Sequence, residues 1–136
     1  MNVKFTRTKK LEDTIELVNE SGGSETLRVS LDLDTVARDF LQKYNTFTAT
    51  HRKLRELQKQ KKTANFDQVA ALYGSVVIDL LELVFGKENA SKILAFYENS
   101  YFEMVQQIMP YITERVLPEI REALKQQKNR LKRSFK

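Results

Sequence analysis

The chain has 136 residues, and its 41% hydrophobic and 30% charged content is typical of a single globular domain rather than a disordered or fibrous chain. It contains no cysteine, which excludes disulfides, thiolate metal sites and cysteine nucleophiles. The formal net charge is +5 at pH 7.

Neither a membrane span nor a signal peptide is predicted. The longest apolar run, Val76–Phe85, is interrupted by Asp79 and Glu82, and it is shorter than the roughly 20 residues that a span requires. Residues 1–10 are basic but are not followed by the apolar core of a signal peptide. We therefore expect a cytoplasmic protein.

The first predicted element is a β-hairpin over about residues 13–33. Ile15 and Leu17 share one alternating register, and a second alternating series follows at Leu27, Val29, Leu31 and Leu33. This period of two is typical of half-buried strands. The segment between them contains paired glycines, which supply the positive φ angles of a reversal. Because an isolated hairpin is marginally stable in water, this one must pack on helices or pair with another chain.

A long helix is predicted next, from an N-cap at Asp34–Thr35 to about Lys62. Its apolar stripe has a period near 3.6 residues and consists of Val36, Phe40, Tyr44, Phe47, Leu54 and Leu57, with His51 in line. The cations between Arg52 and Lys62 suit the negative pole of the helix dipole.

A second helix, from about Asn65 to a C-terminal glycine at Gly86, is predicted to be the central core helix. It carries the strongest apolar stripe of the chain, from Val69 to Phe85. Its other side carries small residues and an isoleucine, either for packing within the chain or for a subunit contact: Ala71, Gly74, Ser75 and Ile78.

The remaining chain predicts shorter helices. One runs from about Lys87 to Asn99, and Ser100 with Glu103 fits a capping box for the next. Pro110 is expected to kink or interrupt that helix, whereas Pro118 suits the first turn of a terminal helix. The expected class is α+β, mostly α, with the hairpin followed by four to five helices.

The terminal helix is expected to continue into a basic tail, residues 125–136. The tail holds six cations and no acid: Lys125, Lys128, Arg130, Lys132, Arg133 and Lys136. Residues 1–124, which we expect to form a single domain, hold 17 basic and 18 acidic residues and therefore have a net charge of −1. The tail could be solvated, contact an acidic protein surface, or bind nucleic acid with Phe135 stacked on a base.

No catalytic, cofactor or metal site is predicted. The only histidine, His51, lies among cations that oppose a metal ion, so we interpret it as structural. Asp32 and Asp34 more simply end a strand and cap a helix, and Asp79 and Glu82 lack a partner base. We therefore expect a protein that is not an enzyme and acts through its surfaces.

Aromatic residues gather around the expected helix break. Phe96, Tyr97, Tyr101, Phe102 and Tyr111 serve either core packing or a partner interface, since tyrosine buries area while its hydroxyl keeps a hydrogen bond. The candidate partner-binding residues are Tyr97, Tyr101, Phe102, Tyr111, Lys125, Lys128, Arg130, Lys132 and Arg133.

The segment Leu80–Ile112 carries a family resemblance. The sequence LVFGKEN at 83–89, followed by ILAFY at 93–97, resembles the tail assembly chaperones of long-tailed phages and prophages of Gram-positive bacteria. The resemblance covers about a quarter of the chain and consists of small, capping and apolar residues, not a catalytic signature. The basic tail has no counterpart in the family pattern.

The resemblance implies a non-enzymatic protein that acts in the host cytoplasm and is absent from the mature virion. Such proteins self-associate and coat the tape measure protein while tail tube subunits polymerise around it, and a longer form is commonly made by ribosomal frameshifting.

The residues by themselves leave open two alternative functions from other classes. One is a small basic helical regulator that binds nucleic acid through the helix at Arg52–Lys62 or the tail, and the other is a structural subunit of a larger particle.

Overall fold

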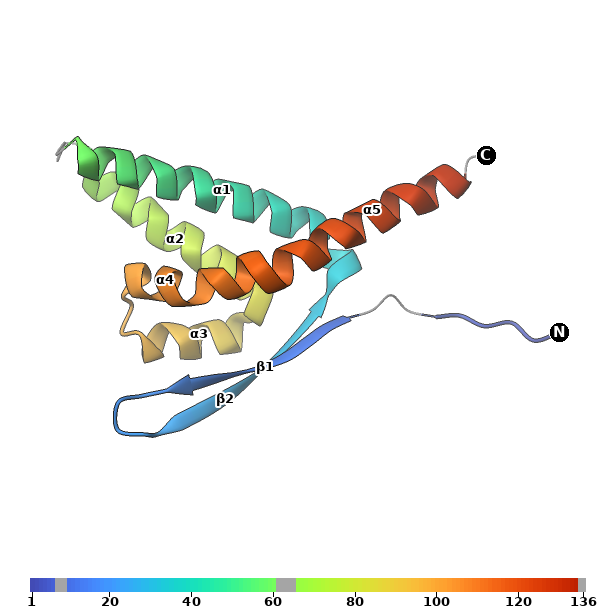
Figure 1. The fold of residues 1–136 in the computed structure, drawn as a ribbon, viewed down its shortest axis with the longest axis horizontal. Helices are drawn as coiled ribbons and strands as arrows, with labels where there is room; N and C mark the ends of the chain where they lie inside the picture. Colours follow the sequence, from blue (N-terminus) through green and yellow to red (C-terminus); the bar gives the residue numbers. More distant parts are fainter. Residues whose placement is uncertain (7–9, 61–65, 135–136) are drawn as a thin grey trace.

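The computed structural model describes residues 1–6, 10–60 and 66–134, apart from the side chain of Ser134. It confirms the α+β, mostly α class, with a two-stranded antiparallel hairpin before the helices. The elements are β1 (Lys10–Val18), β2 (Ser24–Asp32), α1 (Leu33–Lys59), α2 (Phe66–Phe85), α3 (Lys87–Phe96), α4 (Tyr101–Tyr111), the π-helical segment η1 (Ile112–Val116) and α5 (Leu117–Ser134). Figure 1 shows the hairpin on one side of the helices and α5 extending past them.

The hairpin is closed by a short turn. The backbone N–H of Asn19 donates to the carbonyl of Gly23 at 2.9 Å, and that of Gly22 donates to the carbonyl of Asn19 at 3.1 Å. Gly22 has a φ of +88°, which glycine adopts without steric cost. The strands pair along their full length, so the hairpin covers residues 10–32 rather than the predicted 13–33.

One face of the hairpin packs on the helices. The buried strand residues all lie on this face: Leu11, Leu17, Leu27, Val29 and Leu31. The Asn89 side chain on α3 donates to the carbonyl of Arg28 at 2.9 Å, which places α3 beside β2. Within the described residues, by contrast, the backbone of β1 is hydrogen-bonded only to β2. The outer edge of β1 is therefore open.

The N-cap of α1 lies two residues before the predicted one at Asp34. It is Asp32, whose side chain accepts from the backbone N–H of Thr35 at 3.3 Å, so the prediction of a cap at Asp34 is wrong. Asp32 is the N-cap because it is the residue at which the chain leaves the extended strand conformation. The helix ends at Lys59, and Lys61 and Lys62 lie outside the described residues.

The helix α2 is the central core element, as predicted. It packs against α1, α3, α4 and β2, and nine of its 20 residues are buried. By length and composition it is the one described helix that could cross a membrane, but half of its apolar window is buried inside the domain. The helix ends before Gly86, as predicted, and Gly86 has φ +84° and ψ +159°, an extended conformation that only glycine adopts readily.

The turn between α3 and α4 does not contain the predicted capping box. Ser100 is the N-cap of α4, yet its side chain makes no capping hydrogen bond. Its backbone N–H, which the carboxylate of Glu103 was expected to accept from, already donates to the carbonyl of Tyr97 at 2.9 Å. The tight turn through Glu98 and Asn99, both at positive φ, produces that competing bond.

The helix continues through Pro110, so of the two outcomes predicted there, a kink or an interruption, the interruption is wrong. Pro110 lies inside α4, and the wider π turns of η1 follow directly before α5. Pro110 lacks the N–H that would donate to the preceding turn, but the backbone N–H of Ile112 donates to the carbonyls of Ile108 and Met109, so the helix carries on past it. Pro118 is the second residue of α5, in the first turn as predicted. The segments α4, η1 and α5 thus form one continuous helical rod.

Candidate functional site

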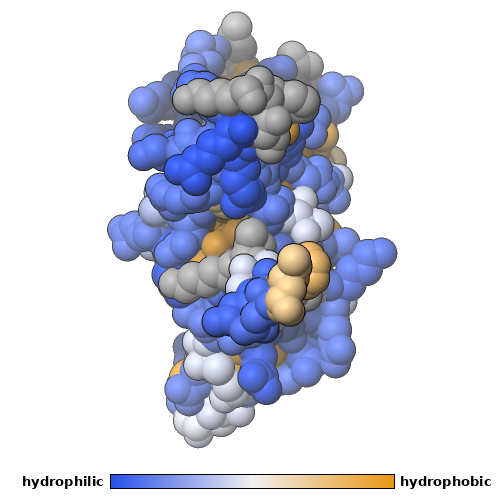
Figure 2. All heavy atoms as spheres, turned by 90° about the vertical axis from the view of Figure 1, so that its right-hand side faces the viewer, coloured by the Kyte–Doolittle hydropathy of each residue, from blue (hydrophilic) through white to orange (hydrophobic). Residues whose placement is uncertain are grey.

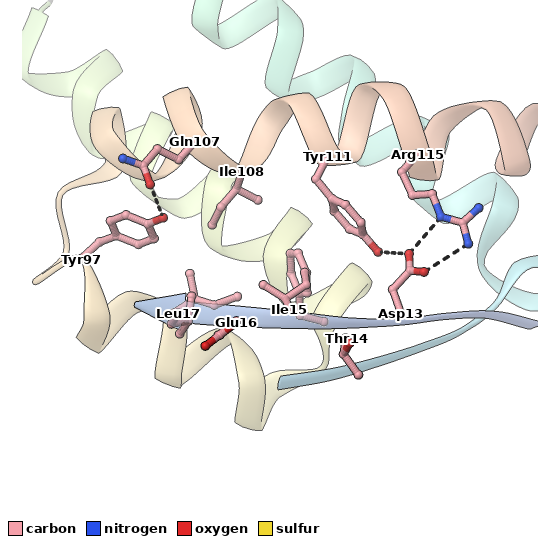
Figure 3. A pocket seen from close by; sticks show the side chains of 12 residues that line it. Asp13, Thr14, Ile15, Glu16, Leu17, Tyr97, Gln107, Ile108, Tyr111 and Arg115 are labelled. Atoms are coloured by element: carbon pink, nitrogen blue, oxygen red, sulfur yellow. Dashed lines mark hydrogen bonds and ion pairs between the residues drawn. The ribbon is translucent and has the colours of Figure 1, made fainter. Parts of the chain in front are cut away.

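An open groove runs between β1 and the helical segment α4–η1 (Figure 3). Its volume is about 680 Å³, within the range of roughly 300–1,000 Å³ common for ligand pockets. We call it the β1 groove, and its lining residues are Asp13, Thr14, Ile15, Glu16, Leu17, Phe85, Ile93, Tyr97, Gln107, Ile108, Tyr111 and Arg115. Polar groups from distant parts of the chain lie at its two ends, and apolar side chains lie between them.

The middle of the groove is apolar because two amphipathic elements present their inner faces there. Ile15 of β1 and Ile108 of α4 are only half-buried, so solvent reaches both side chains. Behind them lie the buried Leu17, Phe85 and Ile93. A partner that covered this region would gain the free energy of burying the remaining apolar surface.

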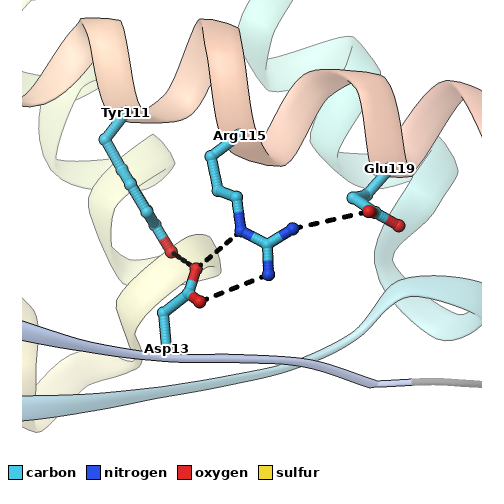
Figure 4. A network of polar contacts seen from close by, with 4 residues as sticks. All are labelled: Asp13, Tyr111, Arg115 and Glu119. Carbon is cyan, nitrogen blue, oxygen red and sulfur yellow. Dashed lines mark hydrogen bonds and ion pairs between the residues drawn. The ribbon is translucent and has the colours of Figure 1, made fainter.

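A polar network ties the hairpin to the helical rod at one end of the groove (Figure 4). The Tyr111 hydroxyl donates to Oδ2 of Asp13 at 2.7 Å. The Arg115 guanidinium contacts both carboxylate oxygens of Asp13, at 3.0 and 3.2 Å, and contacts Oε1 of Glu119 at 3.4 Å. A guanidinium that donates to both oxygens of a carboxylate fixes the relative orientation of the two side chains and also pairs their charges.

The network stabilises the ionised form of Asp13. Hydrogen bonds, first from Arg115 and then from Tyr111, hold the pKa of Asp13 below its usual 3.8. Burial first, and then the hydrogen bond to Asp13, raises the pKa of the Tyr111 hydroxyl well above 10. At neutral pH the carboxylate is therefore charged and the phenol is neutral, which makes the group a structural tie rather than a proton-transfer pair.

The other end of the groove is formed by Tyr97 and Gln107. The buried Tyr97 donates from its hydroxyl to Oε1 of Gln107 at 3.0 Å. Its ring meets that of Phe96 edge to face, with centroids 4.9 Å apart. Tyr97 and Tyr111, both predicted as partner contacts, thus lie at opposite ends of the same groove (Figure 3).

The other two candidate aromatic residues lie elsewhere. The half-buried Tyr101 lies over Gly74 of α2, where an added Cβ would come within 2.9 Å of the tyrosine ring. Phe102 is exposed yet stacks on Tyr73, with ring centroids 5.5 Å apart. Gly74 therefore serves packing within the chain, one of the two roles predicted for the small residues of this helix.

His51 has a structural role, as predicted. Its Nδ1 lies 2.9 Å from the hydroxyl of the buried Tyr73, and its ring stacks on Phe47. Burial first, and then repulsion by Arg55, lowers the pKa of His51 below 6.5. Burial also raises the pKa of Tyr73 to about 12. The pair is therefore neutral at neutral pH and stabilises the contact between α1 and α2.

The basic residues lie on α5, which continues to Ser134. Arg130 forms an ion pair with Asp34 at 2.7 Å, and the Gln127 side chain also donates to Asp34. These contacts tie α5 to the start of α1, and hydrogen bonds from Gln127 and Arg130 lower the pKa of Asp34. The basic members of the candidate set are all exposed: Lys125, Lys128, Arg130, Lys132 and Arg133.

Hydrophilic side chains predominate on the face of the molecule from which α5 extends (Figure 2). Phe135 and Lys136, which the base-stacking hypothesis and the charge count include, lie outside the described residues. The described part of α5 carries exposed cationic side chains.

Within residues 1–6, 10–60 and 66–134, no group of three or more histidine, aspartate or glutamate side chains is placed to hold a metal ion. Three clusters of polar side chains, around Asp13, Asp34 and His51, each connect two secondary-structure elements.

Of the twelve residues that line the groove, sequence reasoning predicted only Tyr97 and Tyr111 as partner contacts. Asp13, Ile108 and Arg115 are among those that it missed. Asp13 did carry a signal, because it occupies a position of the buried register, between Leu11 and Ile15, where an apolar residue is expected. An inward-facing charge on an edge strand requires a partner, and it also discourages unwanted edge pairing. Nothing local could indicate that the partner is Arg115, 102 positions away.

Comparisons with known proteins give no match among family models, curated proteins or solved structures.

Proposed function

We propose that this protein is a non-enzymatic tail assembly chaperone of a long-tailed phage or prophage of Gram-positive bacteria. It self-associates and coats the tape measure protein in the host cytoplasm while tail tube subunits assemble, and it leaves before the virion matures. The resemblance of Leu80–Ile112 to that family suggests the role.

The single structural observation that carries the proposal is the open edge of β1 beside the β1 groove. A strand edge with unpaired backbone groups is a template for another chain. Here it adjoins half-buried apolar side chains, Ile15 and Ile108, so that pairing and apolar burial would occur together. Repetition of such a contact between unlike surfaces builds rings or spirals, the arrangements that a coat on a long client requires.

The cationic end of α5 supports the client part of the proposal. Its exposed lysines and arginines suit a long helical protein with acidic stretches. The same charges suit nucleic acid, which is why the regulator remains the second candidate. We favour the chaperone because of the resemblance carried by Leu80–Ile112 and the open edge of β1 beside the groove.

Coexpression with the tape measure protein tests the proposal. The partner is the product of the very long coiled-coil reading frame that the proposal places immediately downstream of this gene. We expect the tape measure protein to be insoluble alone and to become soluble in a complex with many copies of this chain. An equally soluble tape measure protein in its absence, or no complex, would contradict the proposal.

Binding to double-stranded DNA and to RNA over a range of salt concentrations provides the discriminating control. A nucleic-acid regulator binds measurably at low salt and loses affinity steeply as salt rises. Specific binding together with a failure to capture the tape measure protein would establish the second candidate instead.

A further inference from the structure

The residues before β1 form an extended arm with exposed apolar side chains. We call Met1–Thr6 the arm, and Figure 1 shows it running away from the body of the molecule. Its apolar residues alternate with polar ones, and Val3 and Phe5 are 59% and 94% exposed. Alternation of this kind is typical of a strand with one buried face. The arm thus has the pattern of a strand without a partner.

We propose that the arm docks as an added strand on the open edge of β1, in the β1 groove, of a second copy of this chain. The proposal deepens the self-association in the proposed function and rests on it for its biological purpose. The arm, at roughly 3.3 Å per residue, spans about 20 Å, which is shorter than β1. It can therefore be paired along its whole length.

The alternation of side chains along the arm and along β1 is compatible with this docking. On β1 the odd-numbered residues face the helices, and Ile15 lines the groove with them. A strand added beside β1 with Val3 and Phe5 facing the same way would place both side chains in the groove, against Ile108 on α4. The sheet would then extend beneath α4–η1, where the two-stranded hairpin now leaves a space of about 680 Å³.

The charges on β1 and on the arm also favour the arm as the strand added at this edge. The opposite face of β1 carries the exposed acids Glu12 and Glu16. The polar side of the arm includes Lys4, which would lie on that same face. Cross-strand pairs of opposite charge stabilise a sheet, whereas an acidic strand would be repelled at this edge.

A second copy is favoured over the chain's own arm. Between the arm and β1 the sequence is Arg7-Thr8-Lys9, which contains none of the Gly, Pro, Asn and Asp residues that tight reversals favour. Pairing with the chain's own β1 would require such a reversal. The arm and the groove are different surfaces, so their contact between copies is heterologous and can repeat.

Replacing the two arm side chains tests the proposal. In Val3→Ser/Phe5→Ser, we expect self-association measured by sedimentation velocity at several concentrations to weaken by about a hundredfold or more, from the lost burial of two apolar side chains. Folding should be unaffected, because both residues are exposed. The matched control is Leu72→Ser on α2, which removes a side chain that is 54% exposed and should leave association unchanged.

Cysteine cross-linking locates the contact, since the natural chain has no cysteine. Differently tagged Phe5→Cys and Ile108→Cys proteins, mixed and oxidised, should give a disulfide-linked heterodimer. Phe5→Cys mixed with Leu72→Cys should not. Equal cross-linking to Leu72→Cys would overturn the proposal, and so would a Phe5→Cys/Ile108→Cys chain that closes its disulfide within one copy.

The outcomes separate this inference from the proposed function. If the wild-type chain self-associates and the arm variant does so equally, the arm is not the link and the chaperone proposal stands. A wild-type chain that stays monomeric at every concentration overturns both.

Discussion

At the scale of single residues, Asp13 shows how one buried-face charge is made compatible with the fold. It lies on the face of β1 that packs on the helices, and Tyr111 and Arg115 satisfy its carboxylate from the helical rod. In ordinary strand patterns this position would be apolar. Here the charge fixes the separation of hairpin and rod at one end of the groove.

Replacing Asp13 with Asn should destabilise the protein by about 1 kcal/mol, because it weakens charge-assisted hydrogen bonds at a partly solvated site. The free energy of unfolding from urea titration at pH 7 measures this. Glu16→Gln is the matched control, since it removes the same charge from the exposed face of β1 and should change stability little. Equal effects of the two substitutions would show that Asp13 contributes only through net charge.

The same pair of variants gives a pH test with a defined sign. The pKa of Asp13 is lower in the folded protein than its usual 3.8, so its stabilising contribution is fully present above that value. It is lost as the pH falls through the lowered folded pKa. The stability difference between wild type and Asp13→Asn should therefore shrink below pH 3.8. A difference that grew on acidification would contradict the network.

At the scale of elements, α2 organises the domain because four neighbours pack on it: α1, α3, α4 and β2. Its glycine at position 74 lets the ring of Tyr101 approach the helix backbone. This contact positions the start of α4, and α4 in turn is the helical wall of the β1 groove. Packing of α2 and the shape of the groove are thus connected through Tyr101.

A double-mutant cycle tests that connection. Glycine weakens a helix interior by about 1 kcal/mol relative to alanine, so Gly74→Ala should stabilise a Tyr101→Ala background by about that amount. In the wild-type background the gain should be smaller, because the tyrosine ring must move from the new methyl group. Thermal unfolding of the four proteins supplies the measurement. The control is Ser75→Ala, which lies on the same helix at an exposed position and should show no such coupling to Tyr101. An identical gain in stability from Gly74→Ala in both backgrounds would exclude the contact between Gly74 and Tyr101.

The elements were largely predictable, whereas the groove was not. Alternation at Ile15 and Leu17 predicted the hairpin, and the stripe from Val69 to Phe85 predicted the core helix, because hydrophobic periodicity directly reflects which face is buried. Local signals failed where two of them competed, as at Ser100, whose amide bonds to Tyr97 instead of completing a capping box. The groove depends on contacts between residues about a hundred positions apart, and such contacts leave no periodic trace.

At the scale of the whole molecule, charge and apolar surface are separated. The cationic residues gather on α5, and the apolar groove lies under α4–η1 beside the hairpin. Two separate surfaces allow two partners to be bound at once. This is what a protein that contacts both its own copies and a client requires.

Neutralising the exposed cations while keeping Arg130 separates client binding from folding. In Lys125→Gln/Lys128→Gln/Lys132→Gln/Arg133→Gln, the net charge falls from +5 to +1, and the contacts of Gln127 and Arg130 with Asp34 remain. We expect an unchanged melting temperature and self-association, with weaker capture of the tape measure protein at low salt. Capture is measured by pull-down over a salt series. Undiminished capture would assign the client to another surface.

The uninterrupted helical rod from Tyr101 to Ser134 has a mechanical consequence. Ile108, in the groove wall, and Arg133, near the far end, are separated by roughly 35 Å along one axis at 1.5 Å per residue. Because Gln127 and Arg130 hold the rod to Asp34 near the start of α1, a displacement of Ile108 by a docked strand would strain those contacts before it moved the cationic end.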